Sequence, residues 1–164
     1  MQISEWVEMM CRNGYICKDY NRKLAEVGGK EELFRVLCDS NGGSWLFGMH
    51  ASGAVMVPVS DFVYEFGSYI NGGHVVSYPQ GYSSKFYCRY DGDIEIIADT
   101  TLLYMLECRA SVIVPANAYP SVVLSRGSKA SIAMMPGSRL NIETYGGAEY
   151  SVSGDMTRVR VTKH

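Results

Sequence analysis

Residues 127–152 read GSKASIAMMPGSRLNIETYGGAEYSV, and this stretch repeats a unit of ten residues. When the chain is divided into units of ten from Glu107, the sixth position is β-branched in every unit. The position before it is small and polar in every unit. The β-branched residues are Val112, Val122, Ile132, Ile142 and Val152, and the polar residues are Ser111, Ser121, Ser131, Asn141 and Ser151.

This pairing of columns predicts stacked strands with one buried side and one exposed side. Successive side chains of a strand point to opposite faces, so neighbouring apolar and polar columns mark the inside and the outside. Parallel stacking places like positions on like, whereas an antiparallel meander pairs residues in mirrored order and requires no column identity. The repeat therefore favours a short β-solenoid over a meander.

The length of one coil follows from a second recurrence. Cys88-Arg89, Cys108-Arg109 and Ser128-Lys129 each place a cation after a small residue, at a spacing of twenty. Two strand-turn units of ten residues per coil account for that spacing, and a coil of three units is the alternative. The register slips near Val159 and Val161, which predicts an atypical last strand.

The N-terminal part has a helical period instead. Apolar residues and caps predict helices over 5–11, 17–27, 30–39 and 60–66, with Asn41-Gly42-Gly43 ending the third. Residues 44–57 fit either a helical turn or a buried strand. The expected fold class is α+β: a helical module with a strand-like linker over 1–78, then the β-solenoid module over 79–164.

The two ends of such a stack require protection, because unpaired strand edges invite aggregation. We expect the helical module to cover one end. At the other end, Arg158, Arg160 and Lys163 place cations on the final strand and discourage pairing. We also expect a closed homodimer, through a lateral face or the tyrosine-rich junction between the modules.

Composition limits the class of protein. The 164 residues are 47% apolar and 20% charged, as in a folded domain. Residues 1–78 hold six basic and nine acidic residues, and residues 79–164 hold nine and eight, so neither half attracts nucleic acid by bulk charge. Five cysteines without C-x-x-C spacing indicate a reducing compartment. With neither a signal peptide nor a long apolar run, a cytoplasmic location and no membrane contact are expected.

Metal and cofactor sites find little support. Cys11, Cys17, Cys38, His50 and His74 lie in the N-terminal part, but Cys11 and Cys17 are too far apart for a zinc knuckle, so we expect no metal. Neither phosphate-binding glycine motif occurs, so we expect no nucleotide cofactor. No ordered nucleophile motif accompanies the three histidines, so we assign no catalytic residue.

Two functional alternatives remain open. The acids from Asp91 to Asp99 can supply the pair of carboxylates that glycoside hydrolysis uses, which would make the chain a carbohydrate-binding or carbohydrate-active solenoid. Residues 18–37 fit a helix-turn-helix that would bind DNA, which is the second alternative. Glu31 and Glu32, however, begin the second helix where the DNA phosphates would approach. We therefore expect no nucleic-acid partner.

Candidate binding residues lie on the solenoid and at its junction with the helices. Coils of twenty residues would stack Arg89, Arg109 and Lys129 about 4.8 Å apart, where mutual repulsion favours a bound anion or interleaved acids. Tyrosines close to the junction suit a sugar or protein surface, and the alternative is packing between the modules. The candidate tyrosines are Tyr82, Tyr87 and Tyr90.

The order CRNGYICKDYNRKL, GGKEELFRVLCDSNGGSWL, SDFVYEF and then Ser/Val-rich strands resembles a group of uncharacterised proteins from gut Bacteroidales. Proteins of that group are often carried on prophages and integrated mobile elements. The resemblance implies a mobile-element protein and carries over no functional residue. Together with the residues above, it leads us to expect a non-enzymatic binding or assembly module whose partner is an unknown protein or glycan.

Overall fold

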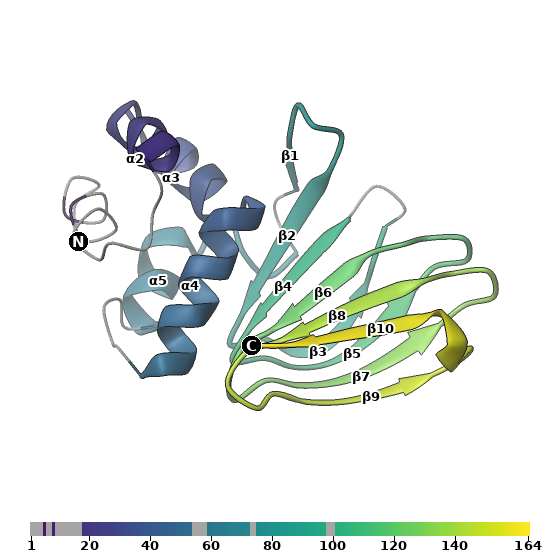
Figure 1. Ribbon diagram of the computed structural model, residues 1–164. Coiled ribbons are helices and arrows are strands. Elements are labelled where there is room, and N and C mark those ends of the chain that lie inside the picture. The colour runs from purple at the N-terminus through teal and green to yellow at the C-terminus, as the bar shows by residue number, and fades with distance from the viewer. Residues whose placement is uncertain (1–4, 6–7, 9–17, 54–58, 73–74, 98–100) are drawn as a thin grey trace.

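A computed structural model describes residues 5, 8, 18–53, 59–72, 75–97 and 101–164. Within these residues, a layer of short helices packs against a β-solenoid made of two facing sheets (Figure 1). The helices are α2 (Lys18–Ala25), α3 (Lys30–Leu37), α4 (Ser40–Ser52) and α5 (Val59–Phe66). The first predicted helix, over 5–11, falls largely outside the described residues.

The strands alternate between the two sheets along the chain. Strands β2 (Ser83–Cys88), β4 (Leu102–Leu106), β6 (Ser121–Leu124), β8 (Leu140–Thr144) and β10 (Val159–Lys163) form one sheet, which β1 (Val76–Ser77) extends to six strands. The four-stranded sheet consists of β3 (Asp91–Glu95), β5 (Arg109–Val114), β7 (Lys129–Met134) and β9 (Glu149–Ser153). A short 3₁₀ turn, η1 (Met156–Arg158), precedes β10.

Every pairing is parallel except that of β1 with β2. Each coil therefore contributes one strand to each sheet, which confirms the predicted β-solenoid with two strand-turn units per coil. The predicted boundary between residues 78 and 79 falls in the connection between β1 and β2.

Coil length changes along the stack. Arg109 lies beside Asp91, 18 residues earlier, and beside Lys129, 20 residues later. The difference arises at the corners between the sheets. Where the chain passes from the six-stranded to the four-stranded sheet, the corners 89–90 and 107–108 hold two residues each and use the left-handed conformation at Arg89 (φ 48°) and Glu107 (φ 52°). The later corners on the same side, 125–128 and 145–148, hold four residues each. The first coil is therefore shorter than the repeat predicts.

The space between the sheets holds the inner core that the repeat predicts. Val112, Val122, Ile132 and Ile142 are each at most 2% exposed, and Val152 on the last coil is half-buried. The polar column beside them is exposed or half-buried throughout. The assignment of the two columns to the inside and the outside is confirmed.

The helices cover the outer face of the six-stranded sheet rather than an end of the stack. Phe86, Tyr104 and Val123 point outward from β2, β4 and β6 and join one core with Phe34 and Phe47 from the helices. An apolar outer face must be buried against another layer, which explains why the helices pack there. The prediction that the helices cover one end of the stack is therefore wrong. Strand β1 covers the outer edge of β2 instead.

Helix α4 corrects the prediction that Asn41-Gly42-Gly43 ends a helix. Asp39 caps α4 by accepting hydrogen bonds from the backbone amides of Asn41 and Gly42, at 3.0 and 2.7 Å. A Cβ atom at Gly43 would overlap the Tyr104 ring, so this glycine permits close contact between helix and sheet. The ambiguous segment from residue 44 is helical as far as Ser52.

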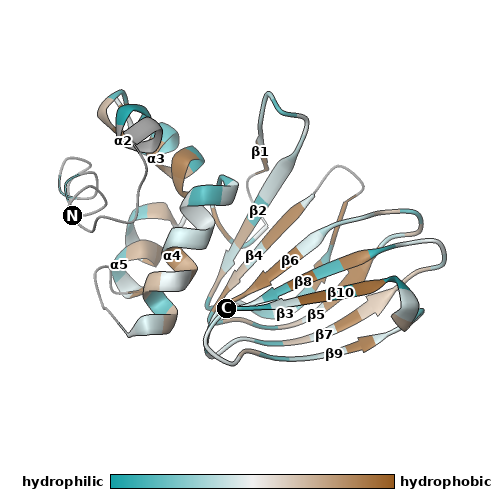
Figure 2. Cartoon of the chain, in the orientation of Figure 1, coloured by the Kyte–Doolittle hydropathy of each residue, from teal (hydrophilic) through white to brown (hydrophobic). Residues whose placement is uncertain are grey.

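Hydropathy follows this layered arrangement. Hydrophobic residues lie along the middle of strands in both sheets and on the helices beside them, whereas the turns are polar (Figure 2). No helix in the described ranges is both long enough and apolar enough to cross a membrane.

Candidate binding surfaces

The outer face of the four-stranded sheet carries a row of charges where the strands begin. Asp91, Arg109, Lys129 and Glu149 are successive register partners, so their order across the sheet is acid, cation, cation, acid. The Lys129 Nζ lies 3.0 Å from Oε2 of Glu149, and both side chains are well exposed. Acids therefore flank the two stacked cations, but no acid lies between Arg109 and Lys129 in the described register, so the acids are not interleaved as the ladder predicts.

Arg89 does not belong to this row, which corrects the predicted ladder. The first coil spans 18 residues, so Asp91 takes the position beside Arg109 that a spacing of twenty assigns to Arg89. Arg89 lies at the corner instead, where its Nε donates a hydrogen bond of 2.9 Å to Oε2 of Glu107.

Two further rows cross the same outer face. Ser111, Ser131 and Ser151 are register partners in the middle of the sheet, and the hydroxyl oxygens of Ser131 and Ser151 lie 3.3 Å apart. Near the strand ends, Ile97, Ile113 and Met135 are 47%, 43% and 48% exposed. From the start of the strands to their ends, the face thus passes from charges to hydroxyls to apolar side chains.

The acids proposed for glycoside hydrolysis lie along one strand. Asp91, Asp93 and Glu95 alternate with inward residues on β3 and are all exposed on the outer face, whereas Asp99 lies outside the described residues. Alternate residues on a strand are about 6.6 Å apart, which is within the range of an inverting pair. The carboxylates, however, lie side by side on one exposed face, rather than on two sides of a bound sugar.

The three candidate tyrosines occupy different environments. Tyr82 is half-buried and stacks on Tyr78 with ring centroids 4.4 Å apart. Tyr87 points into the inner core and is 5% exposed, and Tyr90 packs against it at 5.0 Å. Burial raises the pKa of Tyr87 above its ordinary value. This placement corrects the expectation that Tyr87 belongs to a binding surface, because alternation along β2 turns its ring inward.

A polar cluster that the sequence did not predict joins α4 to a corner of the solenoid. The His50 Nε2 donates a hydrogen bond of 2.9 Å to Oε1 of Glu107, whose other oxygen accepts from Arg89. Partial burial raises the pKa of Glu107, but the hydrogen bonds from His50 and Arg89 outweigh burial and hold that pKa below its ordinary value of 4.5. The Nδ1 atom of His50 is buried without a hydrogen-bond partner among the described residues.

This cluster escaped prediction because no local signal links His50 to Glu107, which is 57 residues away in the chain. Positive φ at a glutamate is a property of the folded corner and has no counterpart in the repeat pattern.

The residues considered for zinc are dispersed. Cys38 is buried in the core shared by helices and sheet, and burial raises the pKa of its thiol well above the ordinary value. His50 is engaged with Glu107, and Cys11, Cys17 and His74 lie outside the described residues. Across the described ranges, no group of three or more His, Cys, Asp or Glu side chains is arranged to hold a metal ion.

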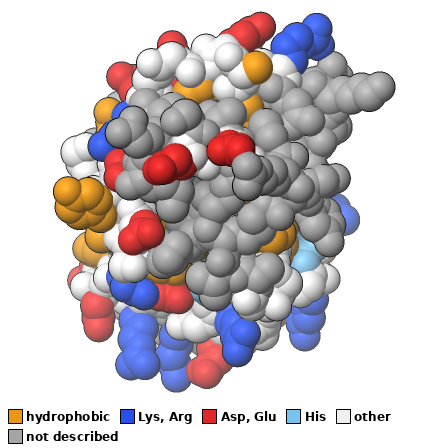
Figure 3. All heavy atoms as spheres, turned by 90° about the vertical axis from the view of Figure 1, so that its left-hand side faces the viewer, with side chains coloured by type: hydrophobic (Ala, Val, Ile, Leu, Met, Phe, Trp, Pro, Cys, Tyr) orange, Lys and Arg blue, Asp and Glu red, His pale blue; other side chains and the backbone are white. Residues whose placement is uncertain are grey.

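The helix-turn-helix candidate is built into the helical layer. Leu33, Phe34 and Leu37 of α3 are buried, and Nη1 of Arg35 donates a hydrogen bond of 2.6 Å to the carbonyl oxygen of Ser77. The exposed first turn of α3 carries Glu31 and Glu32. Among the described side chains on the helical side of the molecule, acids lie in the centre of the view and cations gather at its lower margin (Figure 3).

Comparison with known proteins found no matching family model, no curated relative and no solved structure of similar fold. The association with prophages and mobile elements therefore stays a prediction.

Proposed function

We propose that this chain is a non-enzymatic binding or assembly module, and that a partner protein docks on the outer face of its four-stranded sheet. The observation that supports this proposal is the exposure of Ile97, Ile113 and Met135 on that face. On the six-stranded sheet, the helices cover the large apolar residues of the outer face. On the four-stranded sheet, the large apolar residues of the outer side face solvent.

The arrangement of the face suits a protein partner. Protein interfaces combine an apolar centre that loses its water with a polar rim that stays hydrated. Ile113 lies beside Glu95 and Ala133 in the register, and Ile97 and Met135 follow just after the ends of the neighbouring strands β3 and β7. The serine row and the charged row border this apolar region on one side.

The order of charges favours an unlike partner over a second copy on this face. A two-fold axis along the strands would reverse the strand order and place Asp91 opposite Glu149 and Arg109 opposite Lys129 of the other copy. Like charges that face one another weaken an interface and select against that partner. A two-fold axis across the strands would set the charged row against the apolar row. We therefore infer a different chain that carries acids opposite Arg109 and Lys129.

Capture of partners from a lysate of the source organism tests this proposal. The immobilised wild-type chain is compared with an Ile113→Glu, Met135→Glu variant, which places carboxylates in the apolar region of the face. We expect the variant to lose the captured protein by at least about tenfold, as when hot-spot residues are removed. Tyr64→Glu is the matched control, because Tyr64 is 85% exposed on α5.

Capture that survives the double substitution, or that the control abolishes equally, would contradict the proposal. The carbohydrate alternative has its own test in a screen of polysaccharides with detection of products. Turnover that Asp93→Asn abolishes would replace the binding proposal with an enzymatic one.

A further inference from the structure

The two ends of the solenoid differ. At the first coil, β1 pairs with the outer edge of β2, and the rings of Tyr87 and Tyr90 pack together at the start of the inner core. At the last coil, neither β9 nor β10 has a further strand beside it among the described residues. Both strands therefore present a row of unpaired backbone groups.

The open end is also apolar. Val161 is 39% exposed, although its register partner Ile142 on β8 is fully buried. Tyr150 and Val152 occupy inward positions on β9 but are only half-buried. Met156, in the turn between the two edge strands, is 57% exposed. The last coil thus leaves core positions partly open to solvent.

We propose that this end binds a second copy of the chain, about a two-fold axis parallel to the strands, so that β10 of each copy pairs antiparallel with β9 of the other. This inference does not depend on the proposed function. In the pair, Val159 and Val161 would meet Tyr150 and Val152 of the second copy. Met156 would lie beside its counterpart near the axis.

The offset between the two sheets selects this arrangement. The chain passes from one sheet to the other within a coil, so β9 lies half a strand spacing beyond β8, and β10 half a spacing beyond β9. If β10 paired with β10, the two β9 strands would be separated by two spacings, and the four-stranded sheet would lack a strand. Pairing of β10 with β9 places both junctions at the ordinary spacing of about 4.8 Å.

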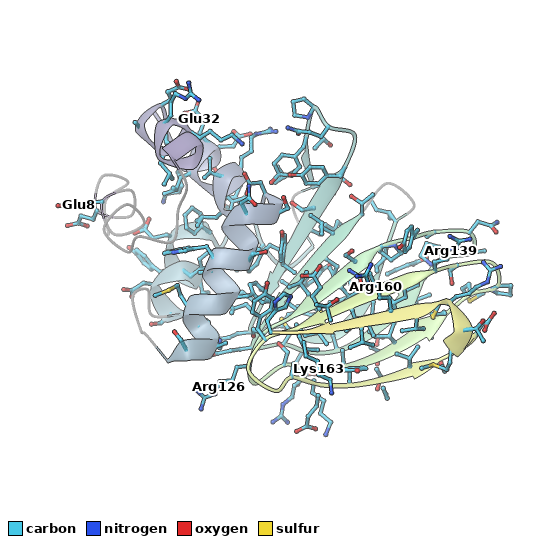
Figure 4. The ribbon with its side chains drawn as sticks, in the orientation of Figure 1. Glu8, Glu32, Arg126, Arg139, Arg160 and Lys163 are labelled. Atoms are coloured by element: carbon cyan, nitrogen blue, oxygen red, sulfur yellow. The ribbon has the colours of Figure 1, made fainter. Side chains whose placement is uncertain are left out.

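Charge favours the same arrangement. Arg160 and Lys163 project from β10 (Figure 4), and Arg158 precedes them. Pairing of β10 with itself would bring the cations of both copies together. Pairing with β9, with Val159 opposite Val152 and Val161 opposite Tyr150, instead places Glu149 opposite Thr162, close to Arg160 and Lys163. The cations that were expected to prevent end-to-end contact therefore oppose only one of the two ways in which the ends can meet.

The pair closes on itself. Each copy uses its last coil, and the first coil does not present the same surface, because β1 covers the edge of β2 there and, among the described residues, only β3 has an open edge. Heterologous contacts that do not close give fibres, but this contact is isologous and stops at two copies.

Light scattering with size-exclusion chromatography tests the proposal at protein concentrations from 1 to 100 µM, which span roughly the affinities of ordinary homodimers. The chain has a mass of 18.2 kDa, so the expected species is twice that mass. Val161→Lys should weaken dimerisation by at least about tenfold, since it places an unpaired charge in the joined core. Tyr64→Lys is the matched control, because Tyr64 is 85% exposed on α5, away from the last coil.

Glu149→Lys distinguishes the two pairings. It should weaken the dimer in the proposed arrangement, because β9 then presents a cation to the cations of β10. Glu31→Lys makes the same change of charge on the exposed first turn of α3 and should leave the dimer intact. A monomer at 100 µM, a dimer that survives both Val161→Lys and Met156→Lys, or growth into larger species would each overturn the proposal.

Discussion

The two sheets of the solenoid share an inner core but differ on their outer faces. In β4, LLYML, four of the five residues are buried and the fifth is half-buried, because helices cover one face and the other sheet covers the opposite face. In β5, RASVIV, exposed residues alternate with inward ones, of which Ala110 is half-buried and Val112 and Val114 are buried. The comparison teaches that alternation is visible in a sequence only where one face of a sheet meets water.

The largest expected effect tests the inner core that the sheets share. Ile132→Asp on β7 should reduce the free energy of unfolding by about 4 kcal/mol or more, because it buries an unpaired carboxylate. Ser131→Asp, at the neighbouring outward position, should change it by no more than about 0.5 kcal/mol. Urea unfolding of both variants measures the difference, and similar losses would contradict the assignment of inner and outer faces.

The second effect compares the outer faces directly. Tyr104→Ala on the six-stranded sheet should cost about 3–5 kcal/mol, because the ring is 2% exposed and packs against Phe47 and Phe86. Ile113→Ala on the four-stranded sheet should cost about 0.5 kcal/mol, as for a surface position. If thermal and urea unfolding gave equal losses, the helical layer would not cover the face that we describe.

A pair of glycines in α4 tests how closely the helix approaches the sheet. Gly43→Ala should destabilise by about 1–3 kcal/mol, since its Cβ atom would overlap the Tyr104 ring. Gly48→Ala meets no described atom within 4 Å and should stabilise the helix by up to about 1 kcal/mol. Opposite signs in urea unfolding are the expected result, and a gain in both variants would place α4 further from the sheet.

The smallest effect concerns the corner where α4 meets the solenoid. The folded state lowers the pKa of Glu107, so its ionised form contributes stability above the unfolded pKa of about 4.5. That contribution is lost as the pH falls through the lower folded pKa. Unfolding of wild type and Glu107→Gln between pH 3 and 7 should therefore show the larger acid loss in wild type. Parallel pH profiles would mean that the interaction of Glu107 with His50 and Arg89 adds no stability.

Particular residues show which positions the sequence repeat predicted correctly and which it did not. Val112, Val122, Ile132 and Ile142 were assigned to the interior from their spacing alone, and all are buried. Prediction succeeded there because the two-residue alternation of a strand is local, and stacking repeats it from coil to coil. Arg89 was misplaced because the repeat was extended to a coil whose corners 89–90 and 107–108 hold two residues each, whereas the later corners 125–128 and 145–148 hold four.

The candidate surfaces were predicted less completely than the core. Arg109 and Lys129 do stack on the outer face of the four-stranded sheet, but Asp91 and Glu149 complete their row. The apolar region at Ile97, Ile113 and Met135 escaped prediction. An isolated apolar residue in a sequence does not reveal whether a second layer covers it.

By itself, the sequence determined the solenoid, its two strands per coil and the side of each strand that faces the core. These properties depend on residue alternation and on the repeat of like positions, which any reader of the chain can count. Only the tertiary structure decided that the helices lie on the outer face of β2, β4 and β6, and that His50 meets Glu107. Both outcomes depend on contacts between residues far apart in the chain. Such contacts are selected by the burial of apolar surface and not by the local alternation of residues along a strand.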